Sequence, residues 1–320
     1  CNQWKFGLKN TKKIIKSLVD ANVDIIECGF LTNKFTYDPE ITKFTAVDEI
    51  AATIPTDRKG KLLVAMMNYG EYDMADLPEY DGRSIDGIRV AFHKKNLTEA
   101  AELCRQIKAK GYKVFVQAMV SLSYSDEEFL AMIRMMNEIE PYAFYIVDSF
   151  GMMKKKNLIR LFYMVENNIK DGIWIGFHSH NNMQLAYSNA QSLVDAQTNR
   201  NLIIDSSIYG MGRGAGNLNT ELLVEYLNEN ADGKYNLKPL LNVIDEILND
   251  FYQKNYWGYS LPNYISAVHW VHPNYAGYLS EKNTLTVEAM DEIFSMMPQD
   301  KRFEFDKDYI EQLYVKYMAT

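Results

Sequence analysis

The feature that most constrains the fold is a repeated alternation of short apolar runs with amphipathic segments. Seven runs have the length and composition of buried strands, namely VDIIECGFL (23–31), KLLVAMMNY (61–69), GIRVAFH (87–93), KVFVQAMV (113–120), AFYIVDSF (143–150), WIGFHSH (174–180) and LIIDSSIYG (202–210). Helical patterns fill the intervals, near residues 10–22, 45–54, 97–110, after 125, 155–168, 183–198 and 219–229. Strands that are apolar throughout and alternate with helices predict a parallel sheet covered on both faces.

Local signals predict where several helices begin. Asn10 or Thr11 can cap the first helix, and Thr45 with Asp48 resembles a capping box. Ser125 and Glu128 form the same pattern before a stripe of apolar residues.

Two architectures fit this alternation, an open doubly wound sheet and a closed TIM (β/α)8 barrel. Polar residues gather at the carboxyl ends of many strands: Glu27, His93, Gln117, Asp148, His178, His180 and, just beyond the last strand, Asn217. A barrel brings all of these ends to one mouth, whereas an open sheet spreads them. We therefore predict a TIM barrel over residues 1–232.

The strand count predicts that one strand lies outside the sequence. The chain begins with a loop and a helix, whereas right-handed βα winding begins with a strand. We expect the first strand to precede Cys1 in a longer polypeptide, or the barrel to be open at this point.

After residue 232 the alternation stops, and residues 233–320 are expected to form a small α-helical region. Helical patterns cover 237–253, 260–271, 286–297 and 306–318, with turn signals at Trp257–Gly258 and His272–Pro273. This region is expected to cover the barrel mouth, form a dimer contact, or do both.

Composition excludes several classes of partner. A net charge of -8 and a pI near 5.3 argue against nucleic acid and anionic membranes. No apolar run approaches the roughly 20 residues that a membrane span requires. Cys1, Cys28 and Cys104 lack metal-binding spacing and are odd in number, which is typical of reduced thiols in a cytoplasmic protein.

The run WIGFHSHNN (174–182) carries the strongest chemical signal. His178 and His180 are two residues apart, so a strand places both imidazoles on one face, where they can hold one divalent metal ion. The alternative is that they are ordinary polar residues at a strand exit.

A glycine-rich segment, MGRGAGN (211–217), follows the last predicted strand. Its three glycines permit unusual backbone conformations and a close approach to a ligand, although a plain loop is the alternative. It lacks the Gly-Lys-Ser/Thr ending of a P-loop. Asn217 offers an amide oxygen of the type that suits Mg2+ or Mn2+.

HSHNN on the seventh expected barrel strand, followed by MGRGAGN after the eighth, resembles the DRE-TIM metallolyase superfamily. This group includes 3-hydroxy-3-methylglutaryl-CoA lyase, isopropylmalate synthase and the 4-hydroxy-2-oxovalerate aldolases. IRVAFH (88–93) and VDSFGMM (147–153) are similar to the aldolase branch in particular.

The resemblance implies a metal site. It makes His178, His180 and Asn217 the metal ligands, and places the carboxylate of Glu27 near the metal and its water. The Asp-Arg pair that names the superfamily ends the first strand, so we expect it upstream of Cys1. Without that pair the site carries no negative ligand and would bind metal weakly.

The same resemblance implies residues for the substrate. Asp148 and Ser149 would line the pocket, although the pair could equally cap a loop. Arg89, His93 and Gln117 would face the mouth or its wall, with a structural ion pair as the alternative for Arg89.

A general base is also implied. Family aldolases use a tyrosine near a Tyr-Ser pair, and Tyr259–Ser260 matches this pair. Tyr264 is the second candidate. Ordinary packing is the alternative for any one of the 22 tyrosines. We count Tyr259, Glu27 and His93 as the candidate catalytic residues.

The resemblance therefore predicts a divalent-metal-dependent aldolase or lyase that acts beside a 2-keto acid such as pyruvate. Mn2+ or Mg2+ is the expected metal, with Zn2+ and Co2+ as alternatives. A homodimer and an aldehyde dehydrogenase partner are expected. The alternatives are an acyl-CoA-condensing synthase or lyase of the same superfamily, and a catalytically degenerate barrel that acts as a scaffold.

Overall fold

The computed structural model of the chain describes residues 3–319, and its central element is a parallel sheet. Within these residues the strands are β1 (Ile25–Leu31), β2 (Lys43–Phe44), β3 (Leu62–Asn68), β4 (Gly87–Phe92), β5 (Lys113–Ala118), β6 (Ala143–Asp148), β7 (Trp174–Ser179) and β8 (Leu202–Ile204). Neighbouring strands are all parallel, in the order β2-β1-β3-β4-β5-β6-β7-β8.

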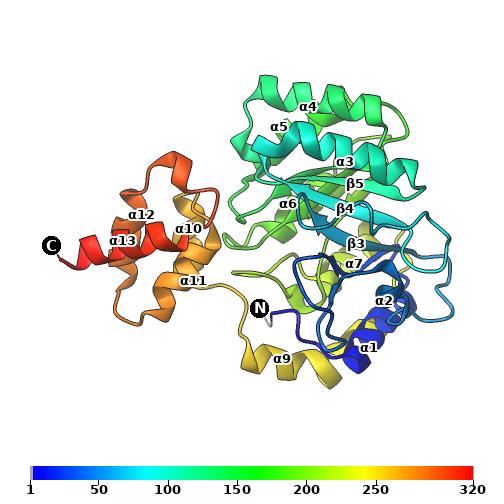
Figure 1. Cartoon of the computed structure of the whole chain (residues 1–320), viewed down its shortest axis with the longest axis horizontal. Helices are drawn as coiled ribbons and strands as arrows, with labels where there is room; N and C mark the ends of the chain where they lie inside the picture. The colour runs from blue at the N-terminus through cyan, green and yellow to red at the C-terminus, as the bar shows by residue number, and fades with distance from the viewer. Residues whose placement is uncertain (1–2, 320) are drawn as a thin grey trace.

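Helices alternate with most of these strands, except that β1 leads to β2 and β3 leads to β4 with no helix between them. The helices are α1 (Leu8–Asp20), α2 (Val47–Ala51), α3 (Leu97–Ala109), α4 (Asp126–Ile139), α5 (Lys155–Glu166), α6 (Ala186–Val194) and α7 (Thr220–Asn230). Figure 1 shows the curled sheet with helices around its outside. The predicted TIM-barrel class is confirmed, and all seven predicted strands are present, although β8 is only three residues long.

The barrel is open between β1 and β8, which lie near opposite ends of the strand order. The two-residue strand β2, which the sequence did not predict, lies at the free edge of β1, with Phe30 opposite Lys43 and Leu31 opposite Phe44. The first strand that we expected before Cys1 falls outside the described residues.

Alternate strand residues point into the barrel, as the period of two requires. An inner cluster joins four strands, β3, β5, β6 and β8, through Val64, Phe115, Ala143, Tyr145, Val147 and Ile203. The opposite faces of the strands pack against the helices in a larger core. Because Val147 belongs to the inner set, its neighbour Asp148 points away from the barrel interior.

The structure confirms one predicted helix start and corrects another. Ser125 Oγ accepts the Glu128 N–H at 3.2 Å, and the Glu128 carboxylate accepts the Ser125 N–H at 2.8 Å, so the predicted capping box opens α4. Before α2, however, Glu49 rather than Asp48 accepts the N–H of Thr45, at 2.7 Å.

The first helix begins earlier than predicted, at Leu8. Asn10 and Thr11 therefore lie inside its first turn and do not cap it. Their side chains instead donate to the carbonyls of Phe6 and Gly7, at 2.8 and 3.0 Å.

The helical region after the barrel has two parts. α8 (Leu237–Val243), a π-helical turn (Ile244–Leu248) and α9 (Asn249–Lys254) run continuously and share a core with Ala21 and Val224 of the barrel. The next four helices are α10 (Leu261–Val268), α11 (Pro273–Glu281), α12 (Val287–Ser295) and α13 (Lys307–Met318). They enclose a core of their own, and Figure 1 shows them beside the barrel. We call α10 to α13 the C-terminal unit.

The division at residue 232 stays a prediction, although packing groups α8 and α9 with the barrel. α11 was not predicted, because His272–Pro273 had the character of a turn. In the structure His272 Nδ1 accepts the N–H of Asn274 at 3.1 Å, and Pro273 occupies the first turn of α11. The supposed turn signal is therefore a helix start.

The structure also bears on two inferences from composition, the absence of a membrane span and the state of the cysteines. Across residues 3–319, no helix combines the length and apolar character needed to cross a membrane. Cys28 and Cys104 are buried free thiols, and burial raises the pKa of each to about 12. Cys1 lies outside the described residues.

Candidate metal centre

The end of β7 brings the two predicted histidine ligands together. The ring centroids of His178 and His180 are 5.4 Å apart and the rings are inclined at 78°. An isolated antiparallel bridge joins His180 to Asn217, which lies in the glycine-rich loop after β8. The structure thus groups all three residues that the sequence predicted as metal ligands.

Two atoms of this group are buried without a hydrogen-bond partner, His180 Nδ1 and Asn217 Oδ1. An unpaired buried polar atom typically costs about 1–3 kcal/mol, so such atoms indicate a missing partner. Asn217 Nδ2 donates to the carbonyl of Met211 at 3.1 Å, which fixes the orientation of the amide. Its oxygen Oδ1 is therefore the atom that is free to bind a metal ion.

The glycine-rich loop must approach Asn217 closely. A Cβ atom on Gly212 would lie 2.7 Å from Asn217 Nδ2 and 2.8 Å from its Cγ, closer than real contacts allow. Glycine at this position is therefore required for the observed placement of the amide.

His178 is held by a carboxylate that the sequence reasoning missed. Its Nδ1 lies 2.9 Å from Oδ2 of Asp205, the residue that follows β8. Asp205 could have been recognised as another polar residue at the carboxyl end of a strand. Burial alone would raise its pKa, but Arg89 and His178 outweigh this effect, and the pKa of Asp205 lies below its ordinary value.

Arg89 forms two ion pairs. It is 7% exposed, and it donates from Nη1 to Glu27 Oε2 and from Nη2 to Asp205 Oδ2. Its Cζ lies 5.5 Å from the centroid of the Tyr145 ring. This is the structural ion pair that the sequence left open as the alternative to substrate binding. Glu27, the predicted carboxylate beside the metal, is one of its two partners.

His180 is neutral. Burial, followed by the charge of Arg213, holds the pKa of His180 well below its ordinary range. A neutral imidazole is the form that binds a metal ion.

Asp148 and Ser149 stabilise the loop after β6. The carboxylate of Asp148 accepts the N–H groups of Met152 and Met153 at 2.9 and 3.0 Å, and burial raises its pKa to about 6. Ser149 Oγ accepts the N–H of Val120 at 2.8 Å. Both side chains make the loop contacts that we gave as the alternative to lining the pocket.

Gln117 lies on the inner face of β5, two residues from Phe115. It is 2% exposed and its Nε2 has no hydrogen-bond partner, so its role in substrate binding stays a prediction.

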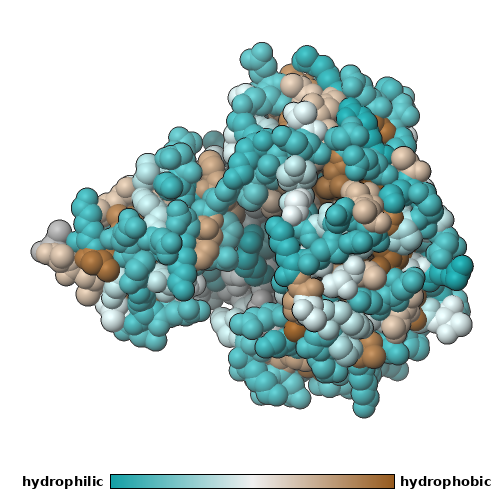
Figure 2. Space-filling model, in the orientation of Figure 1, coloured by the Kyte–Doolittle hydropathy of each residue, from teal (hydrophilic) through white to brown (hydrophobic). Residues whose placement is uncertain are grey.

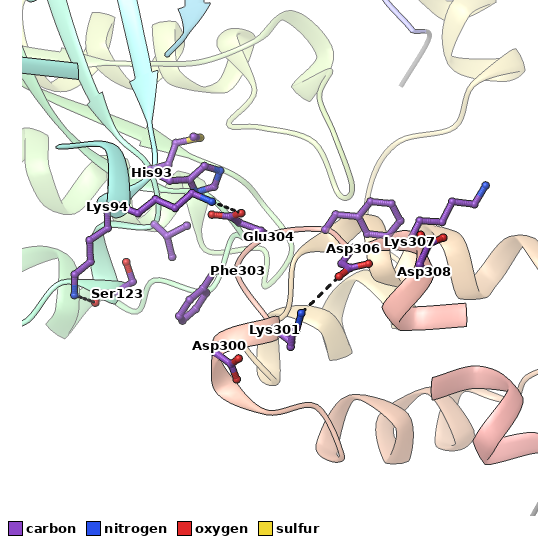
Figure 3. A pocket seen from close by; sticks show the side chains of 14 residues that line it. His93, Lys94, Ser123, Asp300, Lys301, Phe303, Glu304, Asp306, Lys307 and Asp308 are labelled. Carbon is purple, nitrogen blue, oxygen red and sulfur yellow. Dashed lines mark hydrogen bonds and ion pairs between the residues drawn. The ribbon is translucent and has the colours of Figure 1, made fainter. Parts of the chain in front are cut away.

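His93 lies apart from this group of inner residues, at the wall of a cavity of about 940 Å³ between the barrel and residues 300–308. Figure 3 shows His93 and Lys94 on one side of this cavity and Glu304 and Phe303 on the other. Figure 2 shows that the surface is hollowed between the C-terminal unit and the barrel. Burial lowers the pKa of His93, which favours its neutral form.

Tyr259, the predicted general base, lies in the segment between α9 and α10 and is 47% exposed. Its ring centroid is 6.4 Å from that of Tyr264. Ser260 of the same pair caps α10 by accepting the Asn263 N–H at 3.3 Å. The assignment of Tyr259 as a base stays a prediction.

Two other residues that the sequence reasoning missed connect the site to the C-terminal unit. Asn182 is fully buried, and its Nδ2 donates to the carbonyl of Asn263 at 3.2 Å while its Oδ1 has no partner. Arg213 Nη1 lies 3.4 Å from His272 Nε2. Asn182 belongs to HSHNN and Arg213 to MGRGAGN, both of which are motifs that the sequence did single out.

The donor set fits a divalent cation but is neutral. It consists of two imidazoles and one amide oxygen. These are ligand groups that bind ions such as Mn2+ or Mg2+ together with carboxylates. Among residues 3–319, no three or more His, Cys, Asp or Glu side chains are grouped as a metal site. The described residues therefore offer two imidazoles and one amide oxygen as candidate ligands, and their role stays a prediction.

Comparison with known proteins defines the class. The model of the HMGL-like family matches residues 88–247, which is half of the 320-residue chain, and the chain therefore belongs to this family. This confirms the resemblance drawn from HSHNN and MGRGAGN.

Similar proteins within this class are named 4-hydroxy-2-oxovalerate aldolase. One from Geobacillus thermodenitrificans is 25% identical over 228 residues, which cover 70% of this chain and 64% of the relative. One from Burkholderia pseudomallei is 33% identical over 142 residues, covering 44% of this chain and 39% of the relative. The match to the first relative thus spans less than two thirds of its length.

Solved structures share the fold. The N-terminal domain of a protein described as an aldolase from Bacteroides vulgatus has a TM-score of 0.71 at 24% identity, covering 89% of this chain and 93% of its own. The carboxyl transferase domain of Rhizobium etli pyruvate carboxylase also has a TM-score of 0.71, at 12% identity, covering 98% of this chain and 57% of its own. At these identities the likeness shows the fold alone.

Proposed function

We propose that the protein is a divalent-metal-dependent carbon–carbon lyase of the aldolase type, acting beside a 2-keto acid. The observation that carries this proposal is the pair of unpartnered, buried donor atoms on His180 and Asn217 next to His178. The names of the relatives support the aldolase reaction, and membership of the HMGL-like family supports a lyase.

His178, His180 and Asn217 would hold the cation, and the barrel interior would surround the keto acid. When bound, a divalent cation supplies Lewis-acid stabilisation of the charge that develops on a carbonyl oxygen. The apolar inner cluster around Tyr145 and Val147 limits water on one side of this site.

The chemistry then requires two proton transfers, one from the hydroxyl group of the substrate and one to a carbon atom of the enolate. A base removes the proton of the 4-hydroxyl group, the C4–O bond becomes a carbonyl, and the C3–C4 electron pair passes to the pyruvate enolate. Protonation of C3 completes pyruvate. Tyr259, Glu27 and His93 are the candidates for this base, and Glu27 must first be released from Arg89.

Exchange of the pyruvate methyl protons in D2O tests the proposal, because enolate formation needs no aldehyde. We expect Mn2+-dependent exchange in the wild-type protein and its loss in the variant carrying His178→Ala and His180→Ala. His269→Ala is a matched control, because this histidine pairs with Asp291 in the C-terminal unit, with 2.7 Å between Nε2 and Oδ1. Equal exchange rates in the double variant and the wild type would refute the mechanism.

One observation favours the scaffold alternative, namely the neutral ligand set. A complete absence of exchange in the wild-type protein with Mn2+ or Mg2+ would support that alternative. Homodimerisation, an aldehyde dehydrogenase partner, a cytoplasmic location and the acyl-CoA reaction stay predictions.

A further inference from the structure

The carboxylate of Asp205 is the meeting point of three side chains inside the barrel. Its Oδ2 lies 2.9 Å from His178 Nδ1 and accepts from Arg89 Nη2. Tyr145 lies close by, and burial together with the charge of Asp205 holds the pKa of its hydroxyl well above the usual range. The Asp205 side chain is 15% exposed, so these contacts are largely shielded from water.

Arg89 fixes Asp205 from the opposite side of the barrel. It lies on β4 and also donates to Glu27 on β1, so its guanidinium spans from β1 to the end of β8. These two strands are not neighbours in the sheet. The two ion pairs therefore hold Asp205 in place across the open side of the barrel.

The hydrogen bond between Asp205 and His178 determines where the imidazole carries its proton. An ionised carboxylate can only accept, and a neutral imidazole has a single N–H. In the neutral form of His178 the proton is therefore on Nδ1, and the lone pair is on Nε2. This is the arrangement that second-shell carboxylates impose on metal-binding histidines.

We propose that Asp205 is a positioning residue for the candidate metal centre, and that Arg89 holds it so that His178 presents Nε2 as a ready donor. The inference rests on the proposed function for its cation. Asp205 makes the two histidines differ in how firmly their rings are oriented. Nδ1 of His178 is bound to a carboxylate, whereas Nδ1 of His180 has no hydrogen-bond partner. His178 is oriented before a ligand arrives.

Nitrogen NMR of the metal-free protein tests the inference without any variant. In protein labelled with 15N-histidine, His178 should show an N–H signal at Nδ1 and an unprotonated Nε2. An Nε2–H tautomer at His178 in the wild-type protein would overturn the inference.

The substitution Asp205→Asn should change both the tautomer and the affinity. The amide can donate to Nδ1, which favours the Nε2–H form, and the loss of a second-shell partner typically weakens metal binding 10–100-fold. Asp171→Asn is the matched control, because Asp171 also pairs with an arginine, Arg200, at 2.7 Å but is fully exposed. Its Mn2+ affinity should equal that of the wild type.

The outcomes separate the inference from the proposed function. Calorimetric Mn2+ binding that is equal in the wild type and Asp205→Asn would overturn the positioning role and leave the metal centre standing. If the wild type binds no Mn2+, the proposed function fails, and the NMR tautomer alone decides whether Asp205 orients His178.

Discussion

At the scale of the residue, the barrel interior is fitted around a few large side chains. Tyr145 is 1% exposed and lies against Gly176 of the neighbouring strand β7. A Cβ atom on Gly176 would lie 2.4 Å from Tyr145 Cγ, well inside any real contact. The glycine in WIGFH thus makes room for the ring that lies beside the guanidinium of Arg89.

Gly176→Ala should therefore destabilise the protein by about 1–3 kcal/mol, the usual cost of an overpacked core. Chemical denaturation would measure the change in the free energy of unfolding. Gly277→Ala in α11 is the control, because a Cβ there meets nothing within 4 Å and alanine favours a helix. Similar stabilities of the two variants would contradict this view of the interior.

The sequence could predict the ligands but not the residues that hold them. His178, His180 and Asn217 belong to motifs whose spacing indicates their chemistry. Asp205 and Arg89 are 116 residues apart and meet across the barrel, so no local pattern connects them. The direction of Asp148 could not be predicted either, because its neighbour Val147 takes the inner position on β6. The role of Asp148 in the substrate pocket stays a prediction.

At the scale of the element, the long strands and most helices could be predicted because each is encoded by its own apolar periodicity. β2 could not, since two residues paired through the backbone leave no pattern. α11 was missed because His272 and Pro273 resemble a turn, although the same residues begin the helix.

The cap of α11 predicts a dependence of stability on pH. Burial, followed by the charge of Arg213, lowers the pKa of His272 to about 3, and its neutral Nδ1 accepts the N–H of Asn274. The unfolded chain binds a proton near the ordinary histidine pKa of about 6.5. Stability from this group is therefore present above pH 6.5 and is lost as the pH falls toward 3.

The substitution His272→Asn keeps a capping acceptor and removes the titrating group. Between pH 6 and pH 4, its free energy of unfolding should fall less steeply than that of the wild type, by up to about 1.4 kcal/mol per pH unit. Urea denaturation followed by circular dichroism at several pH values would test this. Parallel slopes for the two proteins would contradict the proposed titration.

At the scale of the whole molecule, the barrel and the C-terminal unit have separate hydrophobic cores. They meet through a small apolar cluster that includes Phe150 and Ala267, and through the ion pair of Lys95 with Glu304 at 2.8 Å. Asn182 adds a contact directly beyond the histidine pair. The C-terminal unit is thus attached next to the candidate metal centre.

The central claim is that β7 and the loop after β8 together hold a divalent cation. Pulsed EPR of bound Mn2+ in protein labelled with 15N-histidine tests it most directly, because imidazole nitrogens couple only when they are ligands. We predict couplings from two imidazoles, with one lost in each of the variants His178→Ala and His180→Ala. Bound Mn2+ without nitrogen coupling, or with couplings unchanged in both variants, would contradict the claim.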